Sequence, residues 1–107
     1  MINTREVQLF LVKGDTLAFN MEFSGLESDL SSAYFGAKTN PNANDYAFLI
    51  ELNDGISKTS DGIYLVRLAP DDTSSLTSGI YYYSLKVGVS TDVYTIMFGQ
   101  INIIETA

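Results

Sequence analysis

The fold of this chain is decided by one stretch, DDTSSLTSGIYYYSLKV at residues 71–87. It opens with an acidic turn, continues as a loop of small residues, and becomes a strand after Gly79. Side chains alternate along a strand, so Tyr81, Tyr83 and Leu85 share one face. We predict that this face is buried and that the strand lies at the centre of a sheet.

The position of Tyr81 is typical of a tyrosine corner. In this motif a tyrosine that follows a tight turn donates its hydroxyl group to the backbone of the preceding loop, and so fixes how the chain crosses between two sheets. Asp71 or Asp72 can cap a single helical turn that reaches Leu76. The residues predicted to have structural roles in this stretch are Asp72, Leu76, Gly79, Tyr81 and Tyr83.

The totals of the sequence indicate one domain and exclude several kinds of site. A chain of 107 residues, of which 46% are hydrophobic, is expected to form a single domain over residues 1–107. Cysteine is absent, which excludes disulfides and thiolate metal sites. Histidine, the commonest general acid or base and nitrogen ligand, is absent too. We therefore expect no catalytic residue, no bound metal and no cofactor.

Charge and hydropathy limit the partners. The chain has 13 acidic and 6 basic residues and a net charge of −7. Such a surface repels a phosphate backbone and an anionic membrane, so we expect neither nucleic acid nor a membrane as a partner. No apolar run approaches the ~18 to 20 residues that span a bilayer, and the start Met1–Glu6 lacks the layout of a secretion signal.

Alternating apolar residues predict about seven strands. The first is expected at Glu6–Val12 and ends at a turn that contains Gly14 and Asp15. A long polar connection is expected from Asn53 to Asp61. The remaining strands are expected at residues 17–23, 30–37, 46–52, 62–68, 80–87 and 93–104.

The last predicted strand is interrupted by Gly99. Ile96 and Phe98 are in phase before this glycine, and Ile101 and Ile103 after it. This change of phase predicts a β-bulge at Gly99, which would let one long strand pair at two levels of the sheet.

The strands and turns together predict an all-β chain, an antiparallel immunoglobulin-like β-sandwich of about seven strands. The tryptophan and disulfide usual in immunoglobulin cores are absent. Four aromatic residues are expected to fill that volume: Phe19, Phe35, Tyr83 and Phe98.

Outward tyrosines are the leading candidate for a binding surface. Tyr82 is expected to point away from its two neighbours, and Tyr34 and Tyr94 to point outward as well. Exposed aromatic rings anchor protein interfaces and stack on sugars. The alternative is that these tyrosines only cover the solvent face of a sheet.

Acidic residues give weaker candidates. Asp71 and Asp72 could join Asp54 or Asp61 in a calcium site, but no spacing matches a calcium-binding loop. A turn and helix cap is the favoured interpretation of this pair. Two facing carboxylates could hydrolyse glycosides, although nothing in the sequence places two of them together.

The pattern of turns and apolar positions resembles small β-sandwich proteins of tailed phages and prophages, and in particular the amino-terminal domain of phage baseplate upper proteins. The residues that carry this resemblance are Gly14-Asp15-Thr16, Asp29-Leu30, Ala33, Phe35, Lys38, Leu68, Pro70, Asp72-Thr73, Leu76, Gly79, Tyr81, Tyr83, Leu85, Tyr94-Thr95 and Gly99.

The resemblance implies a non-enzymatic virion protein that docks onto neighbouring tail or baseplate subunits, or onto itself. It implies a location in the virion, and in the bacterial cytoplasm before assembly. The baseplate proteins continue into a helical linker and a receptor-organising region, so host recognition is not implied for this chain. A carbohydrate-binding module that uses the exposed tyrosines is the alternative.

Overall fold

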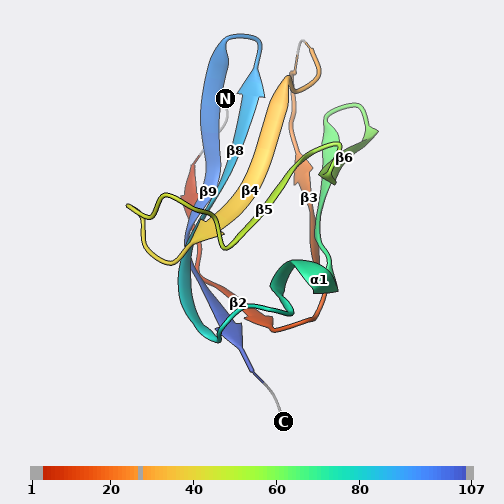
Figure 1. Cartoon of the computed structure of the whole chain (residues 1–107). Coiled ribbons are helices and arrows are strands. Elements are labelled where there is room, and N and C mark those ends of the chain that lie inside the picture. The colour runs from red at the N-terminus through yellow and green to blue at the C-terminus, as the bar shows by residue number, and fades with distance from the viewer. Residues whose placement is uncertain (1–3, 27, 106–107) are drawn as a thin grey trace.

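The computed structural model describes residues 4–26 and 28–105, and these residues form nine strands and one helical turn (Figure 1). The all-β class expected from the sequence is confirmed. The expectation about a secretion signal rests partly on residues 1–3, which lie outside the described residues. The elements are β1 (Arg5–Glu6), β2 (Leu9–Val12), β3 (Leu17–Glu22), β4 (Ser32–Lys38), β5 (Phe48–Leu52), β6 (Gly55–Ser60), β7 (Ile63–Leu68), α1 (Pro70–Thr73), β8 (Gly79–Val89) and β9 (Asp92–Ile104).

The strands form one curled sheet in the order β1-β9-β8-β4-β5-β6-β7-β3, and β2 also pairs with β9. The sheet curls at the short pairing of β5 with β6, so that β6, β7 and β3 lie opposite β9, β8 and β4 (Figure 1). The expectation of a wholly antiparallel sheet is wrong at three pairings. β1 and β2 run parallel to β9, and β5 runs parallel to β6.

Two predicted segments differ from the structure. The predicted strand Glu6–Val12 is divided into β1 and β2, with a break at residues 7–8. The predicted connection from Asn53 to Asp61 contains β6. Only Ile56 of β6 is buried, so the segment lacks an apolar alternation, and its strand conformation comes from antiparallel pairing with β7.

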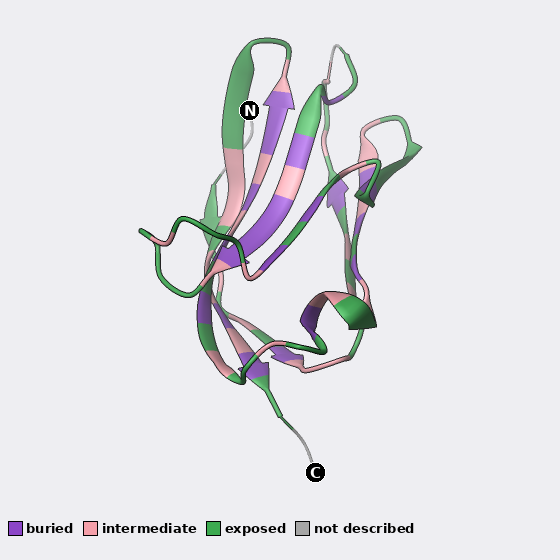
Figure 2. Ribbon diagram, in the orientation of Figure 1, coloured by how far each residue is buried: buried purple, intermediate pink, exposed green. Residues whose placement is uncertain are grey.

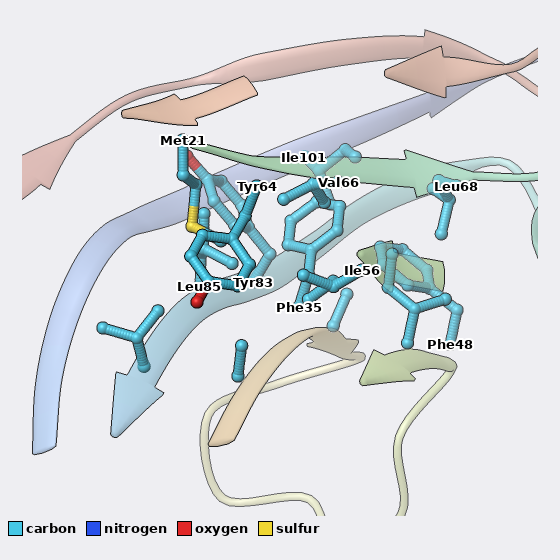
Figure 3. Packing of buried hydrophobic residues seen from close by; sticks show 14 of the residues in the cluster. Met21, Phe35, Phe48, Ile56, Tyr64, Val66, Leu68, Tyr83, Leu85 and Ile101 are labelled. Carbon is cyan, nitrogen blue, oxygen red and sulfur yellow. The ribbon is translucent and has the colours of Figure 1, made fainter. Parts of the chain in front are cut away.

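Figure 2 shows that β4 and β8 carry many of the buried residues. The core is built around Phe35, which is fully buried and lies among the core side chains in Figure 3. Its ring makes edge-to-face contacts with Phe19, Phe48 and Tyr83 at centroid distances of 5.9, 5.4 and 5.6 Å. Edge-to-face geometry is a favoured arrangement of aromatic pairs. Three of the four aromatic residues expected in the core therefore meet there.

Phe98, the fourth, is 41% exposed on the outer side of β9, so its expected place in the core is wrong. The reason lies in the register with β8. Leu85 pairs with Met97 but Lys86 pairs with Thr95, so Ile96 is an extra residue in β9. The bulge is therefore at Ile96 and not at Gly99, which pairs in regular register with Tyr83.

Gly99 instead permits a close approach of the N-terminal segment. Its φ is +147°, and a Cβ at this position would lie 2.6 Å from the carbonyl oxygen of Val7. The same oxygen accepts a hydrogen bond from the Tyr83 hydroxyl at 2.6 Å. As expected from the sequence, β9 is a partner at two levels, because β1 pairs before Gly99 and β2 after it.

The hydrogen bond of a tyrosine corner is present at the start of β8. The Tyr81 hydroxyl donates to the carbonyl oxygen of Thr77 at 2.6 Å. Helix α1 precedes this loop, and the Asp72 carboxylate accepts from the backbone N–H of Ala69 at 2.7 Å. Leu76 packs against the core cluster. The corner, the helical turn and the core are thus joined.

The turn after β2 is tied to the same region. The Asp15 N–H donates to the Val12 carbonyl at 2.9 Å, which closes the turn. Gly14, with φ +85°, donates its N–H to the Thr73 hydroxyl at 3.1 Å. Thr73 is fully buried, so this bond fixes the turn against α1.

We expect Tyr81→Phe to lower the free energy of unfolding by about 1 kcal/mol, because it removes one hydrogen bond and leaves the ring in place. Tyr82→Phe is the matched control, since no side-chain hydrogen bond of Tyr82 is found among the described residues. Urea unfolding of both variants measures the difference. Equal stability of the two would show that the corner bond contributes nothing.

We expect Gly99→Ala to destabilise the fold more than Gly79→Ala. Both glycines have nearly the same φ, +147° and +145°, so both variants carry similar backbone strain, about 1–3 kcal/mol. A Cβ at Gly79 would meet nothing within 4 Å. The clash with Val7 should add about 1 kcal/mol or more at Gly99. Thermal and urea unfolding measure the stability of both variants. An equal loss of stability in Gly79→Ala and Gly99→Ala would contradict this prediction.

Candidate functional site

A groove of about 490 Å³ lies on the outer face of the layer that contains β9, β8 and β4. Aromatic side chains dominate it, and lysine, glutamate and amide groups surround them. We call it the tyrosine groove and define it by Tyr34, Tyr46, Tyr82 and Phe98 with Glu6, Lys38, Lys86 and Gln100.

Strand alternation places two of the predicted tyrosines in this groove. Tyr82 lies between the buried Tyr81 and Tyr83 on β8, so its side chain points outward and is 37% exposed. Tyr34 lies on the neighbouring β4, between buried residues, and pairs with Lys86. Cross-strand neighbours on one face contact each other, so the tyrosines and lysines alternate over this surface.

Tyr46 is a groove residue that the sequence analysis missed. It precedes β5, and its ring meets that of Tyr34 edge-to-face at 6.2 Å. The Lys38 ammonium lies 4.8 Å from the centre of the Tyr46 ring, within the range of a cation–π contact.

Gly36 makes room for this ring. A Cβ at Gly36 would lie 2.7 Å from Tyr46 Cε1, so any larger residue would displace the tyrosine from the sheet. A glycine in the middle of an apolar strand indicates a close approach by another group. That signal in the sequence could have pointed to a ring at this place.

Two tyrosines at this surface, Tyr46 in the groove and Tyr83 beneath it, have raised pKa values. Partial burial, and then the neighbouring Tyr34 hydroxyl, raise the pKa of Tyr46 above its usual value. Burial raises the pKa of Tyr83 to about 12. Both hydroxyls therefore keep their protons at physiological pH, and the Tyr83 proton is donated to the Val7 carbonyl.

Tyr94, the third predicted outward tyrosine, is not part of the groove. It is 38% exposed, but it pairs with the buried Val87 close to the turn of the β8–β9 hairpin. Paired residues in an antiparallel sheet point to the same face. The bulge at Ile96 has thus moved Tyr94 to the opposite face from Tyr82.

The acidic candidates are not brought into one cluster. Asp54 and Asp72 lie along a second surface groove, which Arg67 also lines. The Asp61 carboxylate lies 3.2 Å from the Lys58 ammonium. Within residues 4–26 and 28–105, no three Asp, Glu, His or Cys side chains are grouped in a way that could hold a metal ion. None of the helical structure in the same residues is long and apolar enough to cross a membrane.

No protein-family model matches this chain, and no curated protein matches it. Among solved structures, it is similar to the NK cell receptor NKp44, which is described as a triggering partner in natural cytotoxicity. The TM-score is 0.55 at 12% sequence identity, over 95% of this chain and 99% of that chain. At this identity the likeness shows the fold alone, an all-β and immunoglobulin-like arrangement.

Proposed function

We propose that this chain is a non-enzymatic structural and interaction domain of a phage or prophage particle, and that the tyrosine groove is its docking surface. The observation that carries the docking surface is the set of aromatic rings left open to solvent on one outer sheet face. Tyr82, Tyr46 and Phe98 are 37%, 39% and 41% exposed. Large aromatic side chains are the residues that most often anchor protein interfaces.

We further infer that the curled sheet is a two-layered sandwich of the immunoglobulin type. One layer is β9-β8-β4-β5 and the other is β6-β7-β3. The contact of Phe35 on β4 with Phe19 on β3 supports this arrangement, because it joins the two layers through the core. The tyrosine groove then lies on the solvent side of the first layer.

Charge supports a protein partner with acidic groups at this surface. Lys38 and Lys86 are two of only six basic residues in the chain, and both line the groove. Glu6 is the one carboxylate among the residues that define the groove. The groove is therefore more basic than a chain with net charge −7 is on average. Complementary charges steer association and set its orientation.

The phage setting rests on the resemblance to the amino-terminal domain of baseplate upper proteins. Several residues of that pattern have structural roles here: Asp72 holds the start of α1, Tyr81 forms the corner, and Gly99 admits Val7. A tail or baseplate subunit is the partner that this pattern favours. A second copy of the chain is the other partner of the same class.

A carbohydrate ligand is the second candidate for the same groove. Aromatic rings that lie beside amide, ammonium and carboxylate groups are suited to stack on a sugar ring and to bond its hydroxyls. Gln100, Lys38 and Glu6 supply such groups next to Tyr82.

We expect Tyr82→Ala to weaken copurification of the chain with tail or baseplate proteins by about tenfold or more, as for an interface hot spot. Tyr94→Ala should leave it unchanged. The two tyrosines are equally exposed, 37% and 38%, but only Tyr82 lies in the groove. The measurement is pull-down from particle lysates with tagged variants, together with a glycan array.

Two outcomes would contradict the proposal. The wild-type chain could stay monomeric at high concentration and copurify with no particle protein. Alternatively, it could bind glycans and lose them in Tyr82→Ala, which would establish the carbohydrate candidate instead.

A further inference from the structure

Strand β3 has a free hydrogen-bonding edge. It is the last strand of the sheet order and pairs with β7 alone among the described residues. The N-terminal strands could have covered this edge, but both β1 and β2 pair with β9. The six residues of β3 therefore have a row of backbone groups that no described strand takes up.

The residues that point to this edge follow from the register. The Phe23 N–H donates to the Gly62 carbonyl at 2.8 Å, so Phe23 directs its backbone toward the β7 side. N–H and C=O groups of successive residues point to opposite sides of a strand. By this alternation, the three residues that direct their N–H and C=O groups to the free edge are Ala18, Asn20 and Glu22.

The edge lacks most of the devices by which proteins commonly protect an edge strand. Natural edge strands are often blocked by proline, by lysine, by a bulge or by being very short. β3 contains no proline and no lysine, and its register with β7 is regular over all six residues. Glu22 is its single charged residue.

A hollow with a partly apolar lining lies beside this edge. It has a volume of about 220 Å³ and opens between β3 and the strands β1, β8 and β9. The bulge at Ile96 contributes to it, because Ile96 and Met97 are consecutive and yet both line the hollow. Its apolar lining is Phe19, Met21, Phe23, Leu85, Ile96 and Met97, and its polar lining is Arg5, Asn20 and Glu22.

We propose that the β3 edge is a docking site for an extended segment of another polypeptide, which pairs with β3 as an added strand. The free backbone groups require a partner in strand conformation, and the hollow beside them accepts apolar side chains from one face of that strand. Strand addition supplies affinity through main-chain bonds and specificity through alternate side chains. The segment therefore has apolar residues at every second position.

The charged side chains beside the edge indicate which charged residues the segment would carry. Glu22 is exposed at the end of the edge, the exposed Arg5 of β1 lines the same hollow, and the chain as a whole carries a net charge of −7. A lysine or arginine that faces Glu22 across the strands would be favoured and a carboxylate there would be repelled, whereas a basic residue placed beside Arg5 would be repelled. This site is separate from the tyrosine groove, with which its lining shares no residue.

The test uses a synthetic peptide of alternating valine and threonine with lysine at both ends, and a peptide of the same composition without the alternation. Hydrogen exchange of the free protein should be fast at the amides of Ala18, Asn20 and Glu22 and slow at those of Phe19 and Met21. The alternating peptide should slow exchange at the first three amides. The shuffled peptide should not.

Asn20→Pro tests the pairing directly. It removes an N–H that points to the free edge and leaves the bonds to β7 intact, so the fold should persist by circular dichroism. We expect it to weaken peptide binding, measured by fluorescence anisotropy, by at least about tenfold. Asn20→Ala, which keeps the N–H, is the matched control and should bind the peptide more tightly than Asn20→Pro does.

Glu22→Lys keeps the proposal testable if the proline variant fails to fold. It should weaken binding of the lysine-ended peptide and improve binding of a glutamate-ended one. The proposal is overturned by protected edge amides in the free protein, by no binding of the alternating peptide, or by equal binding of Asn20→Pro and Asn20→Ala. Self-association that Asn20→Pro abolishes would also overturn it, because a second copy would then occupy the edge.

Discussion

The N-terminal strands β1 and β2 are hydrogen-bonded to β9, and this pairing decides which strands lie at the two ends of the sheet. The contact at Val7 holds this N-terminal segment there, since the Val7 carbonyl accepts from the Tyr83 hydroxyl at 2.6 Å while the Val7 N–H donates to Phe98 at 3.0 Å. Only a glycine at position 99 lets the backbone approach so closely. The segment thereby extends the β9 layer at one end of the sheet and leaves β3 as the last strand at the other.

The two faces of β8 differ in burial. Tyr81 and Tyr83 are almost fully buried and donate their hydroxyls to the backbone carbonyls of Thr77 and Val7, whereas Tyr82 lies between them in the outer groove. Tyr64 is also buried, and its hydroxyl accepts from the Leu30 N–H at 3.0 Å. Buried tyrosines thus substitute for the tryptophan and disulfide that are missing, because each fills volume and also satisfies a backbone group.

Much of the fold could be predicted from local patterns, because these patterns reflect burial. Leu17, Phe19 and Met21 alternate with exposed residues, as β3 requires, and the Tyr81 bond follows from its position after a turn. Pairing partners could not be predicted in this way. β6 shows a single buried residue, Ile56, so its strand conformation is visible only once β7 is beside it.

The candidate site was predicted only in part, because alternation within a strand is visible in the sequence and contacts between separate segments are not. Alternation along β8 gives the outward direction of Tyr82. Tyr46 instead reaches the groove from the loop before β5, and Gly36, which leaves room for its ring, is the one sign of it in the sequence. Phe98 and Tyr94 exchange their expected faces because Ile96 is an extra residue. A bulge has no strong signature in one sequence, since an apolar residue suits either side of it.

The two surfaces differ in the kind of recognition they permit, and this bears on how the domain could act. The tyrosine groove presents side chains, so its partner must match a shape and a set of charges. The β3 edge presents backbone groups, so its partner must adopt a conformation and an alternation of residues. The two linings share no residue, and one lies on an outer sheet face while the other lies at the seam between the strands. Because the two proposed sites share no residue, a folded neighbour bound in the groove would leave the β3 edge open to an extended segment.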